Sequence, residues 1–196
     1  AHEGVIINES GLLEKARSQG NSLTLPAGVP FHIAAGPEAA NIAFVSQWNT
    51  FPDVITIPLS GQARHAYLLM AGSTHHMQSR FENGEVVVSY TDETEERLQL
   101  RNPETWWPIE RDYFIDDYAF RMNAARPLRI RLDSGEVYFD KTEYTRSKAV
   151  LSHQIPSGAA TVLDLPLDSN RELKALKLRA IANEVVIGLM SVTLAK

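Results

Sequence analysis

The stretch Leu128-Arg-Ile-Arg-Leu132, followed by Asp133-Ser-Gly135 and then by Glu136–Phe139, decides the fold class. Its three apolar residues alternate with two arginines, which is the period of two expected for a strand with one buried and one solvated face. Gly135 can adopt the positive φ that a three-residue hairpin loop requires. The segment therefore predicts a β-hairpin with one apolar and one basic face.

Alternating or denser apolar runs of this kind recur along the whole chain. They lie at Ile55–Leu59, Tyr67–Ala71, Val86–Tyr90, Glu96–Leu100, Leu163–Leu167, Leu176–Ala180 and Val185–Leu194. The densest runs, Tyr67–Ala71, Val86–Tyr90 and Val185–Leu194, predict strands buried on both faces. The turn-forming pair Asn83-Gly84 precedes one of these strands.

Pro58 and Pro166 cannot donate to a ladder, so their segments are expected at a sheet edge or a bulge. Helical signal is confined to Gly11–Ser18, with Ser10 as the expected N-cap and Gly20 beyond the end. The pattern predicts an all-β chain. We expect a two-sheet antiparallel β-sandwich with at most one short helix, and residues 1–196 as a single domain.

Composition excludes several classes of function. The net charge of -5 argues against nucleic acid as a partner, and no uninterrupted apolar stretch is long enough to span a membrane. The absence of Cys removes disulfides, thiolate metal sites and Cys nucleophiles. The chain starts at Ala1 without a leader, so we expect a processed or excised segment, and its apolar ending before Lys196 suggests a natural C-terminus.

Residues 102–120, NPETWWPIERDYFIDDYAF, break the alternating pattern. Six of the 16 Trp, Tyr and Phe residues of the chain lie between Trp106 and Phe120, together with several carboxylates. One interpretation is carbohydrate recognition, in which flat rings stack on sugars and polar groups bond to hydroxyls. The alternative is an Ω-type loop whose aromatic side chains close the core of the sandwich.

The carbohydrate interpretation gives a specific set of site residues. Trp106 or Trp107 would stack on the sugar, and we expect one of this pair to face outward. The polar contacts and a further aromatic surface would come from Arg111, Asp112, Tyr113 and Asp116. Trp48, just before the Phe51-Pro52 turn, is instead interpreted as a core anchor.

Other clusters carry weaker signals. The neighbouring acids Asp116-Asp117 favour a solvated turn or a calcium ligand over a glycosidase pair, whose two carboxylates come from separate elements. His75-His76 is expected in a solvated loop. The basic residues between Arg121 and Lys148 are expected on a solvated sheet face, with an acidic glycan or a neighbouring domain as the alternative contact.

Several motifs together resemble a known family. They are W-N-T-F-P-D-V-I-T-I-P at Trp48–Pro58, the strand at Ala63–Thr74, G-E-V-V-V-S-Y-T-D at Gly84–Asp92, N-P-E-T-W-W-P at Asn102–Pro108 and N-E-V-V-I-G-L-M-S-V-T-L at Asn183–Leu194. This set resembles the galactose-binding-like jelly-roll domains that accompany bacterial glycan-degrading enzymes. The likeness covers roughly residues 40–110 and 160–196 and reaches no motif in residues 121–152.

The resemblance implies a C-terminal, non-catalytic domain of a larger secreted or periplasmic bacterial protein, with a structural calcium ion as a possible cofactor. Three functions stay open. An ancillary domain would pack on the catalytic domain of the same chain or complex through an apolar patch on one sheet face. A carbohydrate-binding module would bind a poly- or oligosaccharide. An independent enzyme would need convergent carboxylates in a cleft.

Overall fold

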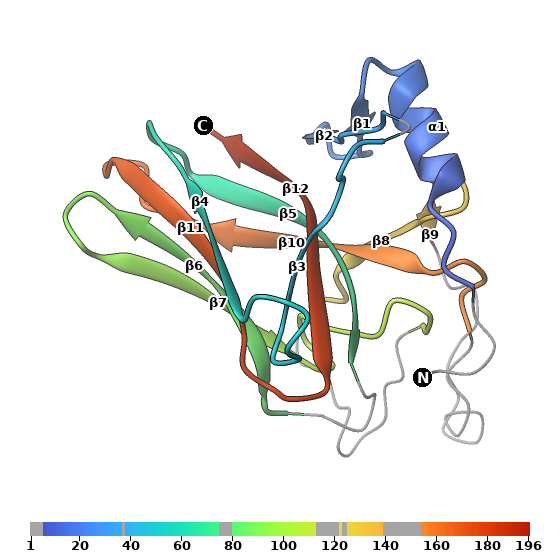
Figure 1. The fold of residues 1–196 in the computed structure, drawn as a ribbon. Helices are drawn as coiled ribbons and strands as arrows, with labels where there is room; N and C mark the ends of the chain where they lie inside the picture. The colour runs from blue at the N-terminus through green and yellow to red at the C-terminus, as the bar shows by residue number, and fades with distance from the viewer. Residues whose placement is uncertain (1–5, 37, 75–79, 113–121, 123–124, 139–153) are drawn as a thin grey trace.

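A computed structural model describes residues 6–36, 38–74, 80–112, 122, 125–138 and 154–196, and shows two antiparallel sheets that face each other (Figure 1). The larger sheet has the strand order β3 (Ala43–Ser46), β12 (Val185–Ala195), β5 (His65–Thr74), β10 (Ala159–Pro166), β8 (Leu128–Arg131) and β9 (Val137–Tyr138). The smaller sheet has the order β4 (Val54–Pro58), β11 (Leu173–Ala180), β6 (Glu82–Tyr90) and β7 (Glu95–Arg101). The predicted all-β antiparallel sandwich with one short helix is confirmed.

A third layer covers part of the outer face of the six-stranded sheet. It consists of α1 (Ser10–Ser18) and a small hairpin of β1 (Ser22–Thr24) and β2 (Pro30–His32) (Figure 1). Leu12 and Ala16 are the buried residues of the helix, and they pack with Phe31 of the hairpin against the sheet. The helix begins at Ser10 with Glu9 as its N-cap, so the predicted N-cap at Ser10 is one residue too late.

Two apolar cores result from this arrangement. The core between the sheets includes Leu68, Met70, Val86, Val88, Leu176, Leu178 and Ile187. The second core lies under the helix and hairpin and includes Leu69, Ala71 and Ile130. Because β5 contributes alternate residues to both cores, its sequence is a continuous apolar run, as predicted for a strand buried on both faces.

The prolines lie where no ladder bond is lost. Pro58 lies in β4, an edge strand of the smaller sheet, which confirms the predicted edge position. Pro166 pairs with His65 of β5, but the pairing of β10 with β8 ends at Val162, so this end of β10 has a neighbour on one side only. The predicted turn at Asn83-Gly84 is wrong, because both residues lie within β6.

Among the described residues, no helix is long and apolar enough to cross a membrane.

Candidate functional site

The tryptophans that sequence analysis selected for sugar stacking are buried. Trp106 is 1% exposed and Trp107 is 2% exposed, so the expectation that one of them faces outward is wrong. Trp106 belongs to the core between the sheets, where its ring lies against Gly72 of β5. The indole Nε1 of Trp107 donates a hydrogen bond of 2.6 Å to the backbone carbonyl of Asp112. The position of Trp106 agrees with the alternative interpretation, a loop that closes the core, and Trp107 is buried as well.

A buried arginine explains why this loop folds inward. Arg129 of β8 is 2% exposed, and its guanidinium donates to the backbone carbonyls of Pro108 (3.1 Å), Ile109 (3.1 Å), Ala159 (2.8 Å) and Arg111. One charged side chain thus bonds to four backbone carbonyls, of which those of Pro108 and Ile109 also accept a bond from a backbone N–H. Arg129 was expected on a solvated basic face, and its burial corrects that expectation.

The remaining predicted site residues are divided between the described and undescribed parts of the chain. Asp112 is buried, and its Oδ2 accepts a hydrogen bond of 3.3 Å from the hydroxyl of Tyr138. Arg111 is half-buried and pairs through its backbone with Gln154. Tyr113 and Asp116 lie outside the described residues, as do His75-His76 and Asp117. The structure therefore brings together Trp107, Asp112 and Arg111, but in a packed loop rather than an open platform.

The exposed tryptophan is Trp48. Its side chain is 53% exposed, so its interpretation as a core anchor is wrong. Trp48 lies in the loop of residues 47–53, which connects edge strand β3 of one sheet to edge strand β4 of the other (Figure 1). An indole ring left open to solvent forgoes much of the stabilisation that burial would give it. Such a ring is therefore a candidate for ligand contact.

The backbone of this loop is firmly bonded. Ser46 N–H donates to the carbonyl of Pro52 (2.9 Å), and Phe51 N–H donates to the carbonyl of Trp48 (3.0 Å). The buried hydroxyl of Ser46 donates to the carbonyl of Val185 (2.7 Å) and accepts a bond from Trp48 N–H (3.3 Å). These bonds hold Trp48 in an exposed position and lower the conformational entropy that a ligand would have to remove on binding.

The loop is also joined to the start of β12 and the end of β11. The side-chain Nε2 of Gln47 donates to the carbonyl of Ala180 (2.6 Å), and Ala180 N–H donates to the carbonyl of Asp53 (2.9 Å). Both ends of the loop are thus bonded to one residue of the smaller sheet. The position of Trp48 is set by both sheets together.

Two further aromatic residues belong to this region, Phe51 in the same loop and Phe44 at the end of the chain segment that leads into it. Phe44 of β3 is 37% exposed, and its ring meets that of Phe51 edge to face, with centroids 6.1 Å apart and an interplanar angle of 68°. Phe44 lies opposite Gly188 of β12, where a Cβ atom would come within 2.8 Å of the Phe44 ring. Glycine is required there first because a Cβ atom would lie 2.4 Å from the backbone carbonyl oxygen of Ala71 in β5, and the Phe44 ring fills part of the remaining space. We call Phe44, Trp48 and Phe51 the aromatic cluster.

Exposed polar groups surround the cluster. Gln47, Asn49, Thr50 and Asp53 are exposed in the same loop and offer amide, hydroxyl and carboxylate groups. Aromatic faces next to such groups match the two surfaces of a sugar, which has apolar C–H patches and a rim of hydroxyls. Among the described residues, no three His, Asp or Glu side chains are grouped as metal ligands.

A sequence signal for this site does exist. Trp48 is the one apolar residue between Ser46 and Phe51, and its neighbours Gln47, Asn49 and Thr50 are all polar. An aromatic residue embedded in a polar loop is a better indication of exposure than membership of an aromatic-rich segment. In residues 102–112 the two aromatic side chains, Trp106 and Trp107, are adjacent and are followed by the apolar residues Pro108 and Ile109, and both are buried.

No protein-family model, curated protein sequence or solved structure matches this chain. The function therefore has to be inferred from the geometry of the chain itself.

Proposed function

We propose that this protein is a non-catalytic β-sandwich module of a secreted or periplasmic glycan-degrading protein, and that it binds carbohydrate through the aromatic cluster. The observation that carries the proposal is the exposed ring of Trp48, in a bonded loop that also contains Phe51, whose ring contacts Phe44. Of the alternatives raised by the sequence, carbohydrate binding explains best why an exposed aromatic ring lies among polar loop residues. The site differs from the one that sequence analysis selected.

The proposal is tested by titration of the protein with soluble polysaccharides, followed by calorimetry and by Trp fluorescence. Trp48→Ala should abolish binding, and Phe44→Ala should weaken it, because a stacked ring contributes a large share of the contact surface. Ile181→Ala is a matched control, since it removes another exposed apolar side chain that lies outside the aromatic cluster. Equal binding by the parent protein and Trp48→Ala would contradict the proposal.

A second function is favoured by a separate observation. Val54, Phe81 and Ile181 are also exposed, and they lie at the start of β4, just before β6 and just after β11, at the same end of the sandwich as the Trp48 loop (Figure 1). The opposite end, which carries the β6–β7 and β10–β11 turns, is covered by ion pairs such as Arg171–Asp168 and Lys174–Glu93. This asymmetry supports an ancillary domain that packs on a catalytic domain through its apolar end.

The two functions predict different patterns of hydrogen exchange at this end of the molecule. A packing interface would protect the backbone amides around Phe81 and Ile181 from hydrogen exchange when a catalytic domain is attached, with or without glycan. The combined substitution of Val54, Phe81 and Ile181 by Ser would remove that protection and leave glycan binding unchanged. If these backbone amides are protected only when glycan is added and Trp48 is present, the result would favour carbohydrate binding and argue against a packing interface.

A further inference from the structure

An open groove lies on the molecule next to the aromatic cluster. It has a volume of about 750 Å³ and runs between the β1–β2 hairpin and the edge formed by β3 and β12. One wall comes from Asn21, His32 and Ile33 of the hairpin layer, and the other includes Leu189 and Met190 of β12. Its size falls within the range of about 300–1,000 Å³ that is typical of ligand sites.

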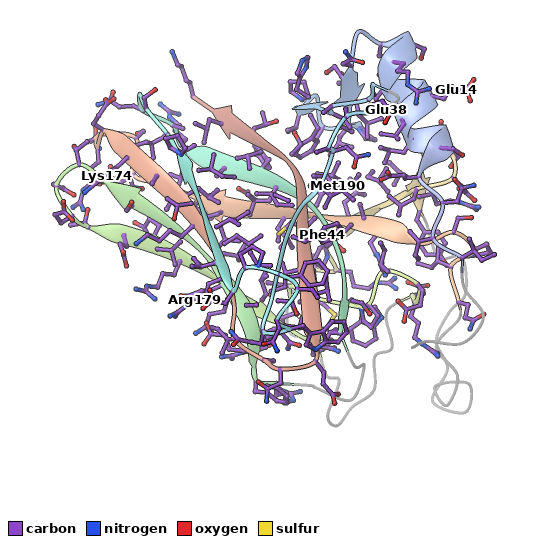
Figure 2. The ribbon with its side chains drawn as sticks, in the orientation of Figure 1. Glu14, Glu38, Phe44, Lys174, Arg179 and Met190 are labelled. Carbon is purple, nitrogen blue, oxygen red and sulfur yellow. The ribbon has the colours of Figure 1, made fainter. Side chains whose placement is uncertain are left out.

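The groove and the aromatic cluster are continuous. Ile42, which lines the groove, and Phe44 of the aromatic cluster both flank Gly188, since a Cβ atom there would lie 2.8 Å from each side chain. Figure 2 shows Phe44 and Met190 close to each other on the same face of the molecule. The lining of the groove therefore meets the aromatic cluster at Ile42 and Phe44, and the Phe44 ring in turn contacts Phe51 of the Trp48 loop.

Among the described residues, those that line the groove include no Asp, Glu, Lys or Arg side chain. Its polar groups are the side chains of Asn21, His32 and Asn41, which can bond to hydroxyls. Asn41 is held in place because its Nδ2 donates a hydrogen bond of 2.8 Å to Oε1 of Glu9, which leaves its Oδ1 as an acceptor. Apolar walls with a few amide and imidazole groups are complementary to an uncharged, hydroxyl-rich ligand, and the lining has no Lys or Arg side chain to pair with a carboxylate or sulfate.

We propose that the groove and the aromatic cluster form one extended site that binds an internal stretch of a neutral polysaccharide chain. The inference rests on the proposed carbohydrate function and specifies its ligand. The aromatic cluster alone provides stacking for a short segment, whereas the groove adds contacts for the sugars that follow. Affinity should therefore rise with the length of the oligosaccharide.

The test uses ladders of one to six sugars from neutral glucans, mannans and xylans, together with the parent polysaccharides and polygalacturonate as an acidic probe. Calorimetry on the complete chain should give at least a tenfold tighter Kd for a hexasaccharide than for the disaccharide of the same series. Polygalacturonate should not compete.

A pair of substitutions isolates the groove. Ala40 is exposed and lines the groove, whereas its exposed neighbour Ala39 does not, so Ala40→Arg blocks the groove and Ala39→Arg is the matched control. Ala40→Arg should bind the hexasaccharide only as tightly as the disaccharide, while Ala39→Arg keeps the gain. Both positions are on the surface, so thermal unfolding should be unchanged in both variants.

The outcomes separate this inference from the function it rests on. Binding that depends on Trp48 but not on chain length, or that is unaffected by Ala40→Arg, would overturn the extended site and leave the carbohydrate function standing. A preference for polygalacturonate would overturn the neutral ligand. Failure of every probe to bind would refute the carbohydrate function itself, and the extended site with it.

Discussion

Replacing Trp106 by Ala should destabilise the protein far more than replacing Trp48 by Ala. Trp106 is fully buried in the core between the sheets, where its ring contacts Gly72, and its removal would leave a cavity. Substitutions of this kind cost about 3–5 kcal/mol, because the lost transfer free energy is joined by the cost of the cavity. This is a large share of a typical folding free energy of about 5–15 kcal/mol.

The cost for Trp48 should be smaller. Its side chain is 53% exposed, so solvent fills the space of the missing ring and no cavity forms. At about 25 cal/mol per Å², and with the buried area discounted for a compact unfolded state, we expect about 1–2 kcal/mol. For a chain of this length each kcal/mol lowers Tm by about 2–4 °C. Trp106→Ala should thus lower Tm by about 6–20 °C, and Trp48→Ala by about 2–8 °C.

Urea unfolding followed by circular dichroism measures both free energies without relying on the tryptophans themselves. If Trp106→Ala does not fold, Trp106→Phe provides a milder change at the same position. Acrylamide quenching is an independent measurement, because one of the three tryptophans should be accessible and Trp48→Phe should remove that component. Equal destabilisation by Trp48→Ala and Trp106→Ala, or quenching that survives Trp48→Phe, would refute the assignment of the exposed ring.

Three further outcomes can be measured on the same protein. Arg129→Met should cost about 2–5 kcal/mol in urea unfolding, because the carbonyls of Arg111 and Ala159 lose the guanidinium donor at about 1–3 kcal/mol each; a loss below 1 kcal/mol would contradict its structural role. Gly188→Ala should lower the free energy of unfolding, because its Cβ atom would lie 2.4 Å from the backbone carbonyl oxygen of Ala71 in the paired strand β5; unchanged stability in urea unfolding would argue against this close approach. The hydrogen bond from Arg131 holds the pKa of Asp133 below its usual value. That carboxylate therefore stabilises the fold above the unfolded pKa of about 3.9, and this stabilisation is lost as the pH falls through the folded pKa. The difference in unfolding free energy between the parent protein and Asp133→Asn should consequently be smaller at pH 3 than at pH 7.

The regular elements follow from local patterns. Alternation in Leu128–Leu132 and in Leu176–Ala180 predicts strands β8 and β11, because a period of two can bury one face only in an extended chain. The continuous apolar run at Tyr67–Ala71 likewise predicts a strand with two covered faces, although not that α1 and a hairpin would cover one of them. Such features depend on neighbours within a few residues, so they can be read from the order of the residues.

The candidate site depended on contacts between distant segments. Trp106 is buried because Gly72 leaves room for its ring, and its loop folds inward because Arg129 meets the carbonyls of residues 108–111. Trp48 is exposed because its loop is bonded to Val185 and Ala180, both more than 130 residues away along the chain. An irregular loop has no periodicity to indicate which side chains face inward, so the direction of each ring is decided by the surface that the rest of the fold places beside it.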